Sequence, residues 1–308
     1  MPDMPAAEVA ISAELVRSLV VSQAGDVIRD AATLPLAKVA EGWDNELWRL
    51  GDDFAVRLPR RSRSAPLVLN EQRALPGIAS RLEPTGVGVP APLVTGHPAL
   101  GYPWVWSIVP WFEGDGGLGI PRSERGEWAE TLAMAIGALH TPAPADHPEN
   151  PVRGVPLAAR AGAVADRLAL LRKSSGVSAP LLDRGEDRWD AGLRAPVWPG
   201  PPLWIHGDLH PGNLVARDGR LSAIIDFGDV TAGDPAYDLA VAWLAFDAPG
   251  RERFRDALGG RYDAASWIRA EAWAAAFAVL LLVHSDDHPE YRRLGLESLE
   301  EIAGASRG

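Results

Sequence analysis

The sequence contains no cysteine, which excludes disulfide bonds, thiolate catalysis and cysteine-ligated zinc. Lysine is nearly absent, since Lys38 and Lys173 are its only occurrences and every other basic residue is arginine. The net charge is −11, whereas a nucleic-acid-binding protein usually carries a basic surface. We therefore expect no nucleic-acid partner. An acidic balance of this kind is compatible with a cationic small molecule as ligand.

Long apolar runs are missing as well. The longest, Ala272–Val283, has twelve residues, whereas roughly 20 are needed to cross a bilayer. Residues 1–16 have no basic start followed by an apolar core, the pattern of a secretory signal. We therefore expect a cytoplasmic protein without membrane contact, and the sequence carries no signal for an oligomeric state.

The first third of the chain is predicted to form a small sheet with flanking helices. Residues 31–60 contain short alternating runs separated by tight turns, which is typical of successive strands. Aromatic and β-branched residues at 102–113 predict another strand. Helical spacing marks residues 11–25 and 66–82, and we expect Pro76 to break or reset the second of these helices.

Beyond a glycine-rich joint at residues 114–119 the pattern becomes helical. Amphipathic spacing predicts helices at 122–142 and 157–172, with further helices toward the C-terminus. A strand-rich part followed by a helix-rich part indicates an α+β fold with two lobes. We assign residues 1–113 to an N-terminal lobe and residues 114–308 to a C-terminal lobe.

The most informative segment is residues 204–229, which read WIHGDLHPGNLVARDGRLSAIIDFGD. One interpretation is a metallohydrolase, because His206, Asp208 and His210 stand at alternate positions and on a strand would face one zinc ion. However, a proline and a glycine turn the chain directly afterwards, and the other histidines are scattered through apparent loops. This interpretation also leaves the second half of the segment unused.

A phosphotransferase interpretation accounts for more of the segment. Phosphoryl transfer needs a carboxylate near the attacking hydroxyl and oxygen ligands for magnesium. Asp208 and Asn213 stand five positions apart, and Asp226 ends an apolar run thirteen residues beyond Asn213. Residues 214–225 are predicted to form a hairpin with Asp218-Gly219 at its turn. That hairpin would bring Asp226 back beside Asn213.

In their order and spacing, the motifs HGDLHPGN, IIDFGD and GDPAYDLA resemble those of the aminoglycoside phosphotransferase family of antibiotic kinases. The resemblance covers most of the chain and implies a two-lobed protein-kinase-like fold, with Mg²⁺ as cofactor and ATP or GTP as co-substrate. It implies that Asp208 is the catalytic base and that Asn213 and Asp226 bind the metal. His206 and Asp238 are then expected to support the catalytic loop.

The same resemblance assigns nucleotide-binding residues in the N-terminal lobe. The turn EGWDN, which contains Gly42 and Asn45, is expected to cover the phosphates. Arg57 stands where protein kinases have a phosphate-binding lysine, and an arginine can bind phosphate while remaining charged. Glu71, in the following helix, is expected to pair with Arg57 and hold it inward.

These assignments predict an enzyme that moves the γ-phosphate of ATP or GTP to a hydroxyl of a small molecule. The resemblance favours an aminoglycoside or a macrolide-type antibiotic as acceptor. Two alternatives stay open, namely a kinase of an ordinary metabolite and a pseudokinase that binds nucleotide without turnover. The chain after Asp226 leaves little room for a peptide-binding segment, which argues against a protein substrate. Candidate residues for binding a cationic sugar are Asp247, Asp286, Asp287 and Glu290.

Overall fold

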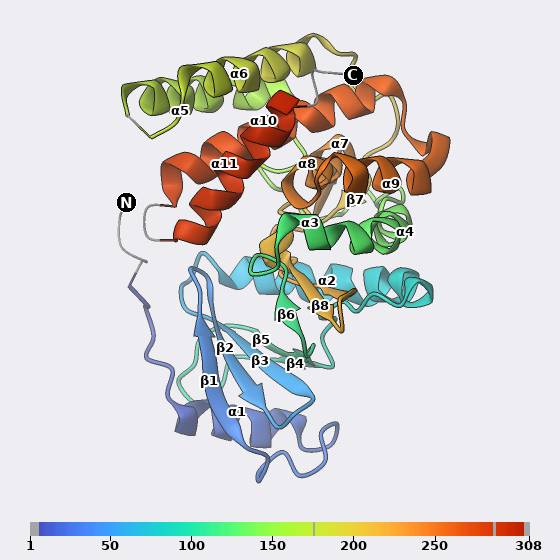
Figure 1. Ribbon diagram of the computed structural model, residues 1–308. Coiled ribbons are helices and arrows are strands. Elements are labelled where there is room, and N and C mark those ends of the chain that lie inside the picture. The colour runs from blue at the N-terminus through green and yellow to red at the C-terminus, as the bar shows by residue number, and fades with distance from the viewer. Residues whose placement is uncertain (1–5, 175, 286–287, 305–308) are drawn as a thin grey trace.

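The computed structural model describes residues 6–174, 176–285 and 288–304. A sheet-rich N-terminal region lies below a larger helical C-terminal region (Figure 1). The predicted α+β arrangement of strands first and helices second is therefore confirmed.

Five antiparallel strands in the order β1-β2-β3-β5-β4 form the N-terminal sheet. Burial alternates along β2, so one face of this strand is covered and the other is open. Helix α1 packs beneath the sheet (Figure 1) and begins at Ser12, whose hydroxyl accepts a hydrogen bond from the Leu15 N–H. These elements are α1 (Ala13–Ala24), β1 (Leu36–Glu41), β2 (Asn45–Leu50), β3 (Phe54–Pro59), β4 (Val94–Gly96) and β5 (Trp106–Pro110).

Helix α2 (Ala65–Leu82) runs without interruption through Pro76, so the prediction that this proline breaks or resets the helix is wrong. An interior proline costs about 3 kcal/mol through a lost hydrogen bond and a steric clash. Leu75, Ile78 and Leu82 are fully buried on the same helix, and each such side chain contributes roughly 1.5–3 kcal/mol of burial free energy. Packing therefore outweighs the local preference.

The hydrophobic residues form two separate clusters. The first joins α1 to the N-terminal sheet. The second extends through the C-terminal helices and includes Ala74, Leu75, Ile78 and Leu82 of α2. The second half of α2 is thus packed into the C-terminal region, although α2 precedes β4 and β5 in the chain.

Helix α10 is the centre of the C-terminal region, where it packs against α5, α6, α7 and α11. By length and composition it could cross a membrane, but 72% of its apolar window is buried inside the protein. The helix predicted at 122–142 is divided into α3 and α4 by a short 3-10 helix at Gly126–Trp128. The helices are α3 (Arg122–Arg125), α4 (Ala129–Leu139), α5 (Ala161–Lys173), α6 (Ala179–Arg194), α7 (Ala236–Leu239), α8 (Val241–Ala245), α9 (Ala248–Leu258), α10 (Ala264–His284) and α11 (Pro289–Gly304).

Two small sheets connect the helices to the interlobe junction. β7 (Leu203–Ile205) pairs with β10 (Thr231–Gly233), while β8 (Leu214–Arg217) lies between β6 (Asp115–Gly116) and β9 (Arg220–Ile224). The predicted hairpin is confirmed as β8 and β9, joined by Asp218 and Gly219 with φ of 51° and 75°. Positive φ at both residues is the geometry of a tight two-residue hairpin turn.

Candidate active site

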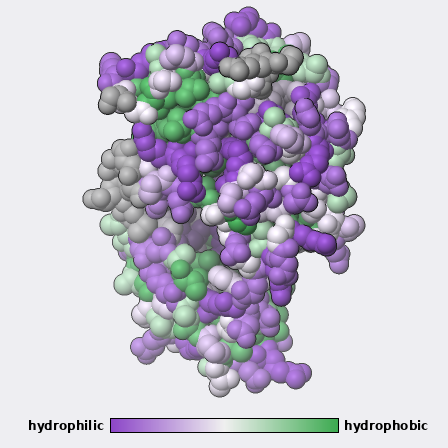
Figure 2. Space-filling view, in the orientation of Figure 1, coloured by the Kyte–Doolittle hydropathy of each residue, from purple (hydrophilic) through white to green (hydrophobic). Residues whose placement is uncertain are grey.

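The loop at residues 206–213 follows β7 and brings the central motif to the junction of the two regions. The surface is hollowed near this junction, with hydrophilic side chains above the recess (Figure 2). Gly207 has φ +83°, and a Cβ atom there would collide with the backbone carbonyl of Asp229. Glycine is therefore required at the position directly before Asp208.

The buried side chain of Asp238 holds this loop, and the buried His140 contacts Asp238. Asp238 accepts hydrogen bonds from the His206 N–H at 2.7 Å and from the Gly207 N–H at 3.1 Å. His140 Nε2 lies 3.2 Å from the same carboxylate. The expectation that Asp238 supports the catalytic loop is confirmed by these contacts. All of these contacts are made within the protein, so the conformation of the loop does not require a bound ligand.

The structure contradicts the zinc interpretation of His206, Asp208 and His210. Strand β7 ends at Ile205, so the three residues do not alternate along a strand. His206 Nδ1 accepts a hydrogen bond from the Asp208 N–H, and its Nε2 donates to the carbonyl of Ile225, which leaves no free ring lone pair. Within the described ranges, no three His, Cys, Asp or Glu side chains are grouped so that they could bind a metal ion.

Asp208 is oriented through both of its carboxylate oxygens. Oδ1 lies 3.2 Å from Arg153 Nη2, and Oδ2 lies 3.5 Å from His210 Nε2. Burial opposes ionisation of Asp208, but the charge of Arg153 and the contact with His210 outweigh it and hold the pKa well below its usual value. Asp208 is therefore a carboxylate with fixed orientation at neutral pH.

Arg153 was not identified from the sequence. It lies in the segment between α4 and α5 and forms an ion pair with Asp229 at 2.8 Å as well as with Asp208. Its Nη1 donates to the Tyr237 hydroxyl at 3.0 Å. Burial alone would lower the pKa of Arg153, but the surrounding carboxylates raise it above its ordinary value. The segment carries no recognisable motif, and these contacts join residues far apart in the chain.

Asn213 and Asp226 lie side by side at the end of the β8–β9 hairpin. The Ile225 N–H donates to the Asn213 carbonyl at 2.9 Å, and Asn213 Nδ2 donates to the Asp208 carbonyl at 2.8 Å. The Asp226 side chain is 61% exposed, and Arg57 lies 3.5 Å from it. Amide and carboxylate oxygens are the hard donors that Mg²⁺ prefers, so this residue pair fits such an ion.

Arg57 is inward-facing and paired with Glu71, as predicted. The distance between Arg57 Nη1 and Glu71 Oε1 is 3.0 Å, without the alignment of a hydrogen bond. Burial raises the pKa of Glu71 to about 7, with Arg57 opposing and Asp226 adding to this shift. The arginine thus links helix α2 to the carboxylate of Asp226.

The turn between β1 and β2 is anchored by charged residues. Asp44 accepts hydrogen bonds from Arg61 at 3.1 Å and from Ser64 at 2.6 Å. The N–H of Gly42 donates to the carbonyl of Asn45, so this N–H is not available to an anion. Asn45 Oδ1 is buried without a hydrogen-bond partner among the described residues.

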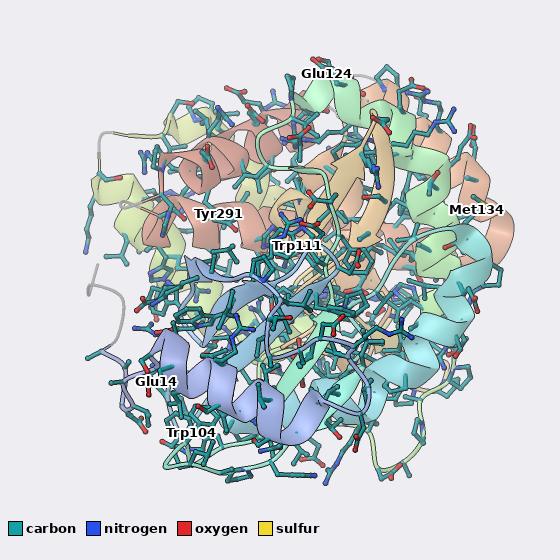
Figure 3. All side chains as sticks on the ribbon, turned by 90° about the horizontal axis from the view of Figure 1, so that it is seen from below. Glu14, Trp104, Trp111, Glu124, Met134 and Tyr291 are labelled. Atoms are coloured by element: carbon teal, nitrogen blue, oxygen red, sulfur yellow. The ribbon has the colours of Figure 1, made fainter. Side chains whose placement is uncertain are left out.

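Of the four candidate residues for binding a cationic sugar, the structure describes Asp247 and Glu290. Asp247 caps α9 by accepting from the Gly250 N–H at 3.0 Å, and Glu290 is in the exposed first turn of α11. Asp286 and Asp287 lie outside the described residues. Tyr291 of α11, labelled in Figure 3, was not predicted; burial first and then nearby carboxylates, including Asp208, raise its pKa to about 12.

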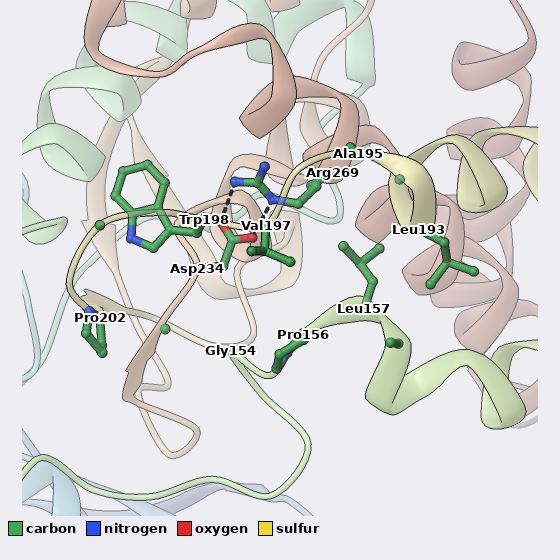
Figure 4. Close-up of a pocket in the computed structure, with 14 residues that line it drawn as sticks. Gly154, Pro156, Leu157, Leu193, Ala195, Val197, Trp198, Pro202, Asp234 and Arg269 are labelled. Atoms are coloured by element: carbon green, nitrogen blue, oxygen red, sulfur yellow. Dashed lines mark hydrogen bonds and ion pairs between the residues drawn. The ribbon is translucent and has the colours of Figure 1, made fainter.

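A cavity of about 260 Å³ has a different lining (Figure 4). It is lined mainly by apolar side chains, among them Leu157 and Trp198. Arg269 and Asp234 form an ion pair of 2.6 Å in its wall. Asp208 does not line the cavity, so this is not the place where an acceptor would meet the carboxylate.

A comparison with protein families identifies the group to which this site belongs. The sequence matches the phosphotransferase enzyme family over residues 35–277. The chain belongs to this family. The match begins just before β1 and ends within α10, so it includes the sheet and the motif segment.

Curated relatives of this phosphotransferase align over part of their length. A homoserine kinase of Gluconacetobacter diazotrophicus is 32% identical over 183 residues, covering 46% of this chain and 56% of the relative. The uncharacterized protein YcbJ of Bacillus subtilis is 29% identical over 141 residues, covering 44% and 45%. The chain therefore spans about half the length of the curated relatives it matches.

Solved structures share the fold over almost the whole phosphotransferase chain. The GDP and kanamycin complex of APH(2")-IIia has a TM-score of 0.65 and 18% identity, covering 94% of this chain and 98% of that chain. The macrolide 2'-phosphotransferase MphH from Brachybacterium faecium has a TM-score of 0.59 and 22% identity, covering 93% and 97%. These matches confirm the kinase-like fold.

Proposed function

We propose that this phosphotransferase transfers the γ-phosphoryl group of ATP or GTP to a hydroxyl of a small molecule. The observation that supports this most is one continuous unit, the loop at 206–213 with its hairpin. Within this unit, Asp208 is oriented by Arg153, Asn213 is bonded to the backbone carbonyl of Asp208, and the hairpin returns Ile225, next to Asp226, to the backbone of Asn213. Solved structures of the same fold include complexes with GDP and with ADP, which support a nucleotide co-substrate.

Asp208 is the general base in this proposal. Its carboxylate accepts the proton of the acceptor hydroxyl while the hydroxyl oxygen bonds to the γ-phosphorus and the nucleoside diphosphate leaves. Base catalysis of this kind contributes about 10²–10⁴-fold. Asn213 and Asp226 would hold Mg²⁺, which when bound neutralises charge on the phosphates. A cytoplasmic location is part of the proposal, because ATP and GTP are available there.

The nucleotide would contact the N-terminal sheet. Arg57, held by Glu71, supplies a fixed positive charge for the phosphates. Gly42 and Asn45 belong to the turn that would cover them. Because the Gly42 N–H is already bonded, we assign this glycine to close approach of the backbone and not to donation of a hydrogen bond.

The relatives support two acceptor classes. Aminoglycoside and macrolide phosphotransferases share the fold, which supports an antibiotic of either type. The homoserine kinase relative supports the second candidate, a kinase of a hydroxylated metabolite. Both candidates use the same proposed base and differ only in what fills the acceptor side.

The test is nucleotide consumption by the purified protein with Mg²⁺, using ATP and GTP separately. The acceptor panel contains kanamycin, gentamicin, erythromycin, homoserine and other small alcohols. Consumption stimulated by one class, with a phosphorylated product in the mass spectrum, supports the proposal and identifies the acceptor. Nucleotide binding without any transfer, including transfer to water, contradicts the proposal in favour of a pseudokinase.

A further inference from the structure

The segment between α4 and α5 contains a rigid turn at residues 148–154. Asn150 Oδ1 accepts hydrogen bonds from the N–H groups of Val152 at 3.0 Å and Arg153 at 3.1 Å. Asn150 Nδ2 donates to Asp229 Oδ1 at 2.9 Å. The adjacent Gly154 has φ +64°, and a Cβ atom there would come within 2.8 Å of Ile205 in β7. The turn is therefore fixed against the strand that leads into the catalytic loop.

This turn directs the Arg153 side chain at the catalytic loop. Nε and Nη2 of Arg153 lie 2.9 Å and 2.8 Å from Asp229 Oδ2, and Nη1 donates to the Tyr237 hydroxyl. Nη2 also reaches Asp208 Oδ1 at 3.2 Å. The guanidinium is thus held by Asp229 and Tyr237, and the remaining direction of its planar fork is occupied by Asp208.

The residue directly before Asp208 in the chain cannot supply the contact that Arg153 makes with the carboxylate. A Cβ at Gly207 would collide with the Asp229 carbonyl, so the residue directly before the carboxylate has no side chain. Arg153 contacts the carboxylate from a segment more than fifty positions earlier in the chain. The same segment leads into α5, and so it connects Asp208 to the outer helices.

We propose that Arg153 is a positioning residue that orients the Asp208 carboxylate for deprotonation of the acceptor. The inference rests on the proposed function of Asp208. Arg153 acts on one oxygen of the carboxylate and His210 on the other. Together they fix the direction of the lone pairs that meet the hydroxyl. A small error in this direction is sufficient to lower turnover by about 10²-fold.

The experiment is a double-mutant cycle of Arg153→Met and Asp208→Asn. Its readout is turnover of phosphoryl transfer from MgATP and MgGTP to water, kanamycin and erythromycin; water requires no identified acceptor. We expect R153M to lower kcat about 10²-fold while KM for the nucleotide changes less than about twofold. Because Arg153 acts through Asp208, the double variant should be no slower than D208N. Effects that multiply would overturn the inference.

Two further variants separate positioning from charge and from folding. Arg153→Lys keeps the charge but cannot contact Asp208, Asp229 and Tyr237 together, so it should be impaired nearly as much as R153M. Arg160→Met removes a charge a few residues away, in a side chain with no carboxylate partner among the described residues, and should leave kcat unchanged. Full activity of R153K would overturn the inference.

A crystal structure of R153M gives a readout that does not depend on turnover. A rotated or disordered Asp208 carboxylate on an unchanged 206–213 backbone supports the inference, and an unchanged carboxylate overturns it. The proposed function has a different point of failure, since it fails if D208N itself transfers phosphate at the normal rate. A damaged D208N with a normal R153M removes only the role of Arg153.

Discussion

The two carboxylates of the site differ in how the protein treats them. Both oxygens of Asp208 are engaged, by Arg153 and by His210. The Asp226 side chain is 61% exposed, and its one ion pair among the described residues is a long one, to Arg57 at 3.5 Å. Asp226 also has φ +59°, an uncommon conformation for a non-glycine residue. The protein thus fixes the orientation of the proposed base, whereas the carboxylate of the proposed metal ligand is exposed to solvent.

Among the three variants that probe this contrast, the largest effect is expected at the exposed carboxylate of Asp226. Asp226→Asn should lower phosphoryl transfer by about 10²-fold or more, because replacing the carboxylate by a neutral amide removes several kcal/mol of charge stabilisation at the proposed metal. Asparagine tolerates positive φ, so the backbone should not change. The measurement is turnover against Mg²⁺ concentration, together with the melting temperature. A normal Mg²⁺ dependence would exclude Asp226 as a ligand.

A substitution that disturbs the loop carrying Asp208 should lower the stability of the protein as well as its activity. Asp238→Ala leaves the buried N–H groups of His206 and Gly207 without an acceptor. Each unsatisfied donor costs about 1–3 kcal/mol, so the free energy of unfolding should fall by about 3 kcal/mol in urea titrations. D226N, by contrast, should be as stable as the parent protein. Equal destabilisation by both variants would contradict the distinction between the loop that carries Asp208 and the exposed Asp226.

The smallest effect is expected at Glu71, which pairs with the arginine that contacts Asp226. Glu71→Gln keeps the shape but breaks the ion pair with Arg57, and nucleotide affinity should fall by about tenfold, as for loss of roughly 1.4 kcal/mol. Titration calorimetry at pH 8 measures this change. An unchanged affinity would mean that Arg57 does not need Glu71 to bind phosphate.

The pH dependence of E71Q sharpens this point. Burial raises the pKa of Glu71 to about 7, so the parent protein should lose nucleotide affinity between pH 8 and pH 6 as Glu71 takes up a proton, whereas E71Q should not. The folded pKa lies above the ordinary value of 4.5. This group therefore makes the free energy of unfolding fall as pH rises from about 4.5 to 7.

The parts of the site that are close in sequence were predictable. The hairpin at 214–224 has a two-residue turn with a known residue preference, and Asn213, Asp226 and Asp238 lie within the motifs themselves. The Arg57–Glu71 contact follows from a strand and the next helix. Local spacing is sufficient in these cases, because the backbone geometry between the residues is regular.

The parts that failed depend on long-range packing. Arg153 contacts Asp208, and Tyr291 packs against His210 of the same loop. Both come from segments without a motif, so nothing in their own neighbourhood indicated a site. Pro76 does not break α2, because burial of the helix outweighs its local cost. Asp247 was a candidate for the acceptor, but the first turn of α9 uses its carboxylate as a cap.

The most direct measurement compares Asp208→Asn with Asp218→Asn. Both remove one negative charge, but Asp218 is 93% exposed in the hairpin turn, where asparagine is well tolerated. With MgATP or MgGTP, D208N should transfer phosphate about 10²–10⁴-fold more slowly at unchanged nucleotide affinity, and D218N should match the parent protein. Equal turnover of D208N and D218N would contradict the assignment of Asp208 as the base.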